Sequence, residues 1–143
     1  MANGNNSKPS IWLADDDPED QELLISAFHQ ITDEYYLTAV KSGKALVELL
    51  TLTGDSELPC LIVLDYNMPG MDGKQTLKLL QNNKRYRNIP KVIYSSSALE
   101  SDQLEFISNG AKAYLIKPNS IGEILRSARK MLDHCHQVLV PVA

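Results

Sequence analysis

The sequence predicts an α/β fold in which a doubly wound sheet of five parallel strands is covered by helices on both faces. Five short, mostly apolar segments alternate with stretches whose apolar residues recur every three or four positions. Strands that are apolar throughout are typical of parallel sheets buried on both sides, whereas each helical stripe covers one side only. A length of 143 residues and a hydrophobic content of 43% suit one domain with a substantial core.

Five segments are expected to form the strands. They cover residues 11–15 (IWLAD), 36–40 (YLTAV), 61–65 (LIVLD), 91–95 (KVIYS) and 113–116 (AYLI). Because a helical stretch separates each strand from the next, the strands should run parallel and be joined by right-handed crossovers.

Each helical stretch carries a narrow apolar stripe and should lie on the sheet surface. Pro18 suits the first turn of the first helix, and Asp17 suits its N-cap. Gly110 suits a left-handed stop after the fourth helix. In chain order, the stripes are Leu24, Ala27, Phe28 and Ile31; Leu46, Leu49 and Leu50; Leu77 and Leu80; Leu104, Ile107 and Ala111; and Ile121, Ile124, Leu125, Ala128, Leu132 and Cys135.

The domain is expected to span residues 9–135. Residues 1–8 are polar and turn-rich and are expected to be disordered. Residues 136–143 form a short tail, after which no output domain is expected. The tail contains the apolar run VLVPV, which either packs onto the domain or forms an interaction strand.

The charge and the cysteine content indicate which partners and which cellular compartment to expect. The net charge is -4, so no basic excess exists to neutralise phosphates, which argues against nucleic acid as a partner. No apolar run approaches the length of a membrane span and no leader opens the chain, so no membrane association is expected. Cys60 and Cys135 form no disulfide framework, and Cys60 is expected to be a buried thiol in a reducing cytoplasm.

Three acids follow two of the strands. Asp15 and Asp16 end the first segment and Asp65 ends the third, and the carboxyl ends of parallel strands share one edge of a sheet. Two carboxylates about 4 Å apart repel by roughly 4 kcal/mol at an effective dielectric near 20, so protons or a cation must compensate them. Oxygen ligands without thiolate or imidazole favour Mg²⁺, with Mn²⁺ as a substitute.

The fourth and fifth strands bring complementary groups to the same edge. Ser95, Ser96 and Ser97 end or follow the fourth strand, and Lys117 follows the fifth. A hydroxyl, an ammonium, a divalent cation and a carboxylate nucleophile together are typical of a phosphoryl-transfer site. Asp65 would attack phosphorus to form an aspartyl-phosphate.

These residues resemble the receiver domains of bacterial two-component response regulators, the CheY-like family. The resemblance covers about residues 9–135 and rests on DDDP after the first strand, LIVLDYNMPGMDG at the third, YSSS after the fourth and AYLIKP at the fifth. It implies a flavodoxin-like (βα)5 sandwich with strand order 2-1-3-4-5. The sequence departs from the family at Ser95, where threonine is commoner, and at Lys91 and Tyr94 in the fourth strand.

The resemblance implies a role for each matching residue. Asp65 would be the phosphoacceptor, Ser95 the switch hydroxyl and Tyr114 the switch aromatic. Lys117 would pair with the phosphoryl group, and its peptide bond to Pro118 would be cis.

The resemblance also implies a metal site and its surroundings. Asp16 and Asp65 would bind Mg²⁺ through their carboxylates and Asn67 through its backbone carbonyl, while Asp15 would act mostly through bound water. The side chains of Asn67 and Ser97 would flank the phosphate and tune its hydrolysis.

The implied function is a phosphorylation switch and not an ordinary enzyme, since the only reactions are Mg²⁺-dependent self-phosphorylation and slow hydrolysis. The donor would be a histidine kinase, a phosphotransfer protein or a small acyl phosphate. A downstream protein would bind the face formed by the fourth helix, fifth strand and fifth helix, and phosphorylation-linked homodimerisation there stays open.

Other functions remain as alternatives. A pseudo-receiver adaptor would need no chemistry, and the intact acids, Ser95 and Lys117 count against it. A haloacid-dehalogenase-like phosphatase would need a D-x-D-x-T/V motif that DDDPE lacks. A flavodoxin-like binder would repel the FMN phosphate with three acids. The HCH run at 134–136 resembles a metal cluster, but helical geometry spreads residues two apart around the axis.

Overall fold

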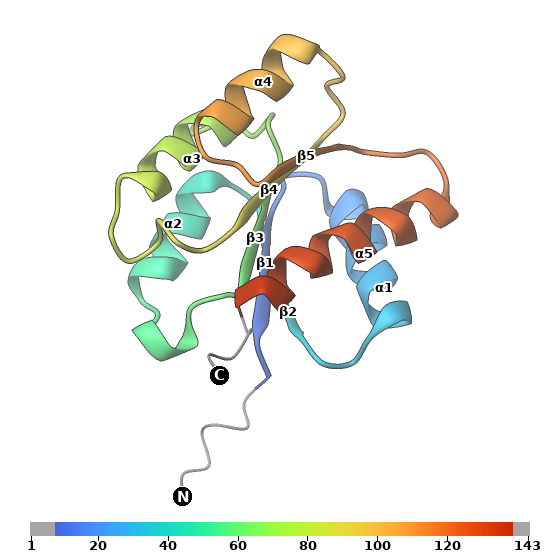
Figure 1. Ribbon diagram of the computed structural model, residues 1–143, viewed down its shortest axis with the longest axis horizontal. Coiled ribbons are helices and arrows are strands. Elements are labelled where there is room, and N and C mark those ends of the chain that lie inside the picture. Colours follow the sequence, from blue (N-terminus) through green and yellow to red (C-terminus); the bar gives the residue numbers. More distant parts are fainter. Residues whose placement is uncertain (1–7, 139–143) are drawn as a thin grey trace, which may run out of the picture.

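The computed structural model describes residues 8–138 and contains one parallel five-stranded sheet of order β2-β1-β3-β4-β5 (Figure 1). The predicted fold class and strand order are therefore confirmed. The first and third strands end one residue earlier than expected, so Asp15 and Asp65 directly follow them. The strands are β1 (Ser10–Ala14), β2 (Tyr36–Val40), β3 (Leu61–Leu64), β4 (Lys91–Ser95) and β5 (Ala113–Ile116).

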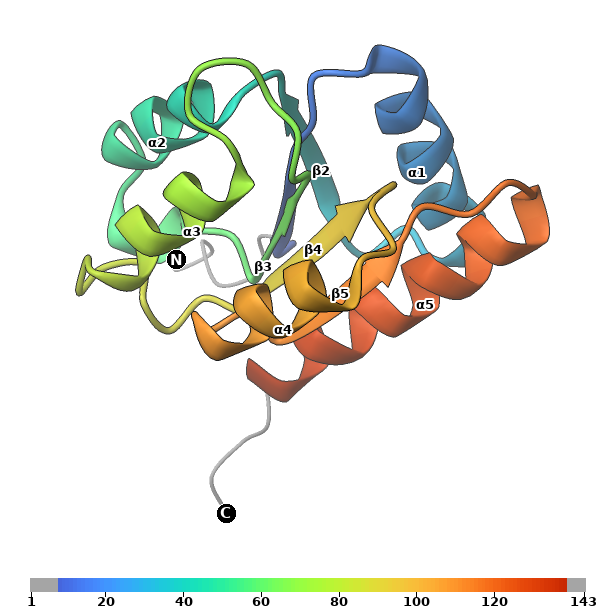
Figure 2. The ribbon, with the colours of Figure 1, turned by 90° about the horizontal axis from the view of Figure 1, so that it is seen from above.

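Helices cover both faces of the sheet. Figure 2 shows α1 and α5 on one side and α2 and α3 on the other, and the buried side chains place α4 with the second group. A short 3-10 helix, η2 (Asp55–Glu57), precedes β3. The helices are α1 (Pro18–Ile31), α2 (Gly43–Thr51), α3 (Gly73–Gln81), α4 (Glu100–Ser108) and α5 (Ile121–Val138).

The central strands β1 and β3 are almost wholly apolar because each contributes to two cores. In β1, Ile11 and Leu13 pack with α1 and α5, whereas Trp12 and Ala14 pack with α2, α3 and α4. Successive side chains of a strand point to opposite faces, so burial on both faces requires apolar residues at every position.

Local signals set the ends of two helices as predicted. Pro18 is the first residue of α1, and the Asp17 carboxylate accepts hydrogen bonds from the backbone N–H groups of Glu19 and Asp20. Gly110 follows α4 with φ of 106°, a conformation that glycine adopts without steric cost.

The apolar stripe predicted for α4 is wrong at two of its three positions; the third, Ala111, is buried but lies beyond the end of the helix. Leu104 and Ile107 are 63% and 45% exposed, whereas Phe106 is fully buried. The Phe106 ring lies 5.1 Å from the Tyr66 ring and 5.7 Å from the Tyr114 ring, between centroids. This short helix thus packs chiefly through one aromatic side chain, which a search for repeated aliphatic residues overlooks.

The final helix begins at the first residue of its predicted stripe, but the exposure of that residue and the end of the helix differ from the prediction. Ile121 is 64% exposed and does not join the core, and the helix runs on to Val138, past residue 135. Of the segment 1–8 that was expected to be disordered, residues 1–7 lie outside the described part of the chain, as do residues 139–143; Lys8 is described, and its ammonium donates a 2.9 Å hydrogen bond to the Asp33 carbonyl. Within residues 8–138, no helix is both long and apolar enough to cross a membrane.

Lys91 opens β4, and its side chain is buried. Its ammonium donates hydrogen bonds to the Gln81 side-chain oxygen and to the backbone carbonyls of Tyr86 and Arg87. Burial lowers the pKa of Lys91 to about 8, and the charge of Lys112 acts in the same direction. The three acceptors explain how the fold accommodates a lysine where an aliphatic residue is usual.

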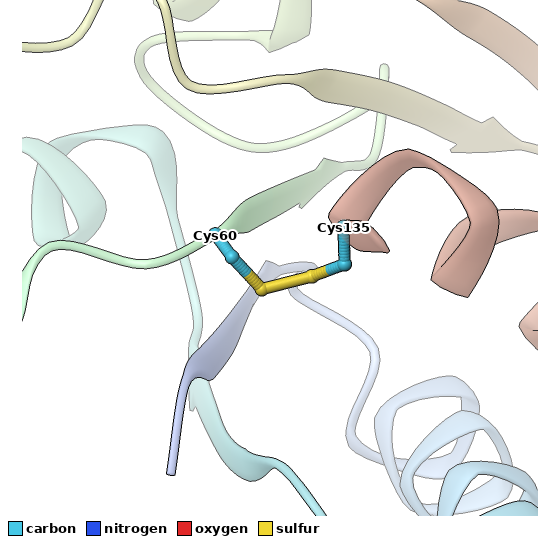
Figure 3. Close-up of a disulfide and its surroundings, with 2 residues drawn as sticks. All are labelled: Cys60 and Cys135. Atoms are coloured by element: carbon cyan, nitrogen blue, oxygen red, sulfur yellow. A yellow bond between two sulfur atoms is a disulfide. The ribbon is translucent and has the colours of Figure 1, made fainter. Parts of the chain in front are cut away.

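The prediction that the two cysteines are unpaired is wrong. A disulfide joins Cys60, just before β3, to Cys135 near the end of α5 (Figure 3). Both residues are buried at the sheet edge opposite Asp65. The partners are 75 residues apart in the chain, so only the folded arrangement of β3 and α5 brings them together. Cys135 is therefore not a metal ligand in the HCH run.

Candidate phosphoryl-transfer site

Three carboxylates meet at the carboxyl edge of the sheet, as the strand ends predict. One oxygen each of Asp15, Asp16 and Asp65 lies within 4.8 Å of the others. Asp15 and Asp65 are each 6% exposed, whereas Asp16 faces solvent. The oxygen donors and the solvent-facing member of the cluster fit a hard divalent cation.

Lys117 brings a positive charge into this cluster. Its Nζ lies 2.8 Å from Asp15 Oδ2 and 3.4 Å from Asp65 Oδ2, and its side chain is 11% exposed. Burial alone would lower the pKa of Lys117, but hydrogen bonds to Asp15 and Asp20 and the charges of Asp15 and Asp65 raise it above its usual value. Lys117 is therefore an ammonium that partly compensates the acids.

Asp20 is a site residue that the sequence reasoning missed. Its Oδ2 lies 2.8 Å from Lys117 Nζ. Asp20 stands four residues before Leu24 in α1, so it continues the buried stripe one turn toward the N-terminus. Because that turn reaches the carboxyl edge of the sheet, a charged residue there points into the site. An acid on an otherwise apolar stripe was the available signal.

The loop after β1 is held by polar side chains. Asp15 Oδ1 accepts a hydrogen bond of 2.9 Å from the Asp17 backbone N–H. Gln21 Nε2 donates to the backbone carbonyls of Asp15 at 2.7 Å and Val40 at 2.8 Å. These bonds anchor α1 to the ends of β1 and β2, which fixes the direction of the Asp15 carboxylate.

The loop after β3 approaches α3 too closely for most side chains. A Cβ on Gly73 would lie 2.5 Å from the Asp65 backbone oxygen and 2.9 Å from Tyr66 Cα. Gly70 in the same loop has φ of 77°, in the left-handed region. The two glycines allow the chain to fold back beside Asp65, as the PGMDG turn predicts.

Ser95 and Ser97 lie in a connected loop after β4. Ser95 is fully buried, and its hydroxyl accepts a 3.3 Å hydrogen bond from the Ser97 backbone N–H. The Ser97 hydroxyl donates to Asp102 Oδ2 at 2.8 Å, so it contacts α4. The backbone N–H of Lys117 donates to the Ser95 carbonyl, which ties the two strand ends together.

Tyr114 connects β5 to the same loop. Its hydroxyl donates a 2.8 Å hydrogen bond to the Ser97 carbonyl, and its ring packs against Phe106. Lys74 holds the other end of this aromatic group, with Nζ 2.7 Å from Glu105 Oε1 and 4.9 Å from the centroid of the Tyr66 ring. The loop after β3, α4 and β5 thus share one contiguous set of contacts.

Of two further expectations for the site, one stays a prediction and the other is wrong. Asn67 is exposed in the loop after β3, and no contact tests its backbone carbonyl as a metal ligand. The peptide bond between Lys117 and Pro118 is trans, so the expected cis bond is wrong. The trans form is the lower-energy isomer by about 0.5–1 kcal/mol for bonds before proline.

Asp65 is electrostatically the most perturbed acid of the site. Burial raises the pKa of Asp65 to about 6, and the negative charge of Asp15 adds to the rise. Lys117 and the backbone N–H of Tyr66 act in the opposite direction. Asp65 is thus a carboxylate that is costly to ionise in this pocket unless positive charge is close by.

Comparison with known proteins agrees with this geometry. The family model "Response regulator receiver domain" matches residues 11–129. The two-component response regulator ORR5 of rice, Oryza sativa subsp. japonica, is 30% identical over 124 residues, covering 87% of this chain and 89% of its own length.

Two solved structures share the fold. The Mn²⁺-bound form of response regulator Rcp1 is 24% identical with a TM-score of 0.79, covering 94% of this chain and 99% of that one. The phosphorylated cyanobacterial phytochrome response regulator RcpA is 22% identical with a TM-score of 0.82, covering 92% and 96%.

Proposed function

The chain belongs to the response regulator receiver domain family, and on that premise we propose that it acts as a phosphorylation switch whose acceptor is Asp65. One observation carries the proposal. Asp65 is a buried carboxylate with Lys117 Nζ at 3.4 Å and with oxygens of Asp15 and Asp16 within 4.8 Å. This arrangement supplies a nucleophile, a cation and ligands for a second cation at one point of the sheet edge.

The phosphoryl donor in this proposal is a phosphohistidine of a histidine kinase or phosphotransfer protein, or a small acyl phosphate. An Asp65 carboxylate oxygen forms a bond to phosphorus as the bond from phosphorus to the donor atom breaks. The electron pair of that broken bond leaves with the donor group. The Lys117 ammonium offsets the charge on the transferred oxygens.

We propose that the resident cation is Mg²⁺, for which Mn²⁺ can substitute, as the Mn²⁺-bound Rcp1 structure suggests. The carboxylates of Asp15, Asp16 and Asp65 and the backbone carbonyl of Asn67 would hold it, with Asp15 acting mostly through water. When bound, the cation neutralises negative charge on the phosphoryl group.

The proposed response couples Ser95 to Tyr114. A phosphoryl group on Asp65 adds acceptor oxygens, to which the Ser95 hydroxyl donates. The Tyr114 hydroxyl donates a hydrogen bond to the Ser97 carbonyl. When the loop from Ser95 to Ser97 moves, this carbonyl moves with it, and the Tyr114 ring can then turn inward. Reversing a state populated at about 1% requires about 5.5 kcal/mol of preferential stabilisation.

The proposed output surface is the face of α4, β5 and α5. Leu104 and Ile107 of α4 and Ile116 of β5 are exposed, which supports binding to a protein. A downstream partner or a second phosphorylated copy would bind there. Size-exclusion chromatography of the protein with beryllofluoride, a phosphoryl mimic, reports the second case as a shift to the dimer.

We propose a cytoplasmic location, where histidine kinases present their phosphoryl groups. The disulfide argues in the other direction, since such bonds are rare in reducing compartments. Alkylation of thiols during cell lysis tests the placement. A Cys60–Cys135 pair that is wholly oxidised in living cells would contradict it.

Phosphorylation itself is tested by acetyl phosphate with Mg²⁺. Intact mass should increase by one phosphoryl group, and Asp65→Asn should abolish the gain because an amide cannot accept the group. The gain should disappear with a chelator and decay after the donor is removed. An aryl phosphate should show essentially no turnover, because we propose a switch and not a phosphatase. An undiminished mass gain in Asp65→Asn would refute the assignment.

Metal affinity should depend on pH through Asp65. Because its pKa is raised to about 6, a proton competes with the cation below that pH. We expect Mg²⁺ to bind roughly tenfold more weakly at about pH 5 than at about pH 7.5. Isothermal titration calorimetry measures this, and Asp65→Asn should lose most of the dependence. Equal affinity at the two pH values would show that Asp65 is not a ligand.

A further inference from the structure

Asp20 reaches the acidic site from a helix, whereas the clustered carboxylates follow strands. Among the described residues, the group of acids close enough to share a metal ion contains Asp15, Asp16 and Asp65 but not Asp20. Asp20 comes from the first turn of α1, and its side chain is 33% exposed. Its carboxylate Oδ2 lies 2.8 Å from Lys117 Nζ.

The contacts of Lys117 are unequal. Its Nζ lies 2.8 Å from both Asp15 and Asp20 but 3.4 Å from Asp65. An ammonium has three N–H donors, and two of them are directed to the shorter contacts. Asp20 therefore draws the charge toward α1 and away from Asp65.

This displacement matters because an ammonium and a divalent cation compete for the same oxygens. If the Lys117 ammonium moved closer to Asp65 while keeping its contact with Asp15, it would occupy an oxygen of Asp65 that a metal also needs. The two cations repel each other and cannot both lie beside the same carboxylate. A second partner that holds the ammonium elsewhere therefore favours the divalent cation.

We infer that Asp20 is a positioning residue, which shares the Lys117 ammonium with Asp15 and so keeps the Asp65 carboxylate available to a divalent cation. The inference deepens the proposed function and rests on it for the identity of the site. In this inference Asp20 acts through Lys117, the residue that its carboxylate contacts.

A simpler role exists for any acid at this point. Negative charge in the first turn of a helix is favoured by the helix dipole, and Glu19 occupies the same turn. Glu19 is exposed, and its replacement removes the same charge from the same turn. Glu19→Gln is therefore a matched control for Asp20→Asn.

The test is a titration with Mg²⁺ alone, without a phosphodonor, followed by calorimetry. We expect Asp20→Asn to raise the dissociation constant about fivefold. Glu19→Gln should raise it by less than about twofold, because a distant exposed charge is screened by salt. Equal effects of the two substitutions would overturn the inference.

A second comparison isolates the action through Lys117. In a Lys117→Met background, Asp20→Asn should weaken Mg²⁺ binding no more than Glu19→Gln does. A fivefold effect that persists without the ammonium would mean that Asp20 acts directly on the metal, and would overturn the inference. Circular dichroism establishes folding first; if the Lys117→Met background does not fold, the single-variant comparison decides.

Failure of the proposed function has a separate readout. If the unaltered protein gains no mass with acetyl phosphate, phosphorylation of Asp65 is refuted. The Mg²⁺ titrations are independent of that result and still decide the role of Asp20.

Discussion

Replacing Lys117 with methionine is expected to lower the free energy of unfolding by about 3 kcal/mol when divalent cations are absent. The ammonium contacts Asp15, Asp20 and Asp65, and the side chains of Asp15 and Asp65 are less than a tenth exposed. Methionine keeps most of the aliphatic stem, so the loss comes from charge and not from packing. Two buried carboxylates would be left without their cation.

The same variant should recover much of its stability when Mg²⁺ is added, since a cation that binds only the folded state stabilises it. Urea unfolding with a chelator and with millimolar Mg²⁺ measures both effects. Lys44→Met, at an exposed position of α2, is the control and should change little in either buffer. A Lys117→Met variant that is as stable as the unaltered protein in chelator would show that Lys117 does not compensate the acids.

Reduction of the Cys60–Cys135 disulfide is expected to lower the free energy of unfolding by about 4 kcal/mol. The bond closes a loop over a sequence separation of 75 residues, and a longer loop restricts the unfolded chain more strongly. It also holds the last turns of α5 to the start of β3 (Figure 3). Reduction gives the unfolded chain more conformational freedom without removing a side chain from the core.

Urea unfolding with and without a phosphine reductant measures the change. The double variant Cys60→Ala, Cys135→Ala should resemble the reduced protein and should not respond to the reductant. This control separates loss of the bond from any other action of the phosphine. Identical unfolding midpoints for the oxidised and reduced protein would contradict the expectation.

The elements that the sequence predicts well are those whose signals are local. All five strands were expected within one residue of their ends because each is a short apolar run closed by a polar residue. Asp17, Pro18 and Gly110 act on the helix ends beside them. The convergence of Asp15, Asp16 and Asp65 also followed, since parallel strands bring their carboxyl ends to one edge.

The misses depend on contacts between distant parts of the chain. Phe106, and not Leu104 or Ile107, is buried on α4, because burial there is decided by the rings of Tyr66 and Tyr114. Apolar periodicity selects a face of a helix but does not identify the neighbour that covers it.

By itself, the sequence determined the strand order through the family it resembles, the strand positions and the edge at which the acids meet. Backbone geometry makes the side chains of a strand alternate between two faces and brings the carboxyl ends of parallel strands to one edge. Both properties can be inferred from the order of residues along the chain. Only the tertiary structure decided that Asp20 reaches Lys117 and that Cys60 bonds Cys135. Those contacts depend on how α1 and α5 are placed on the sheet, and helix placement is a result of packing over the whole domain.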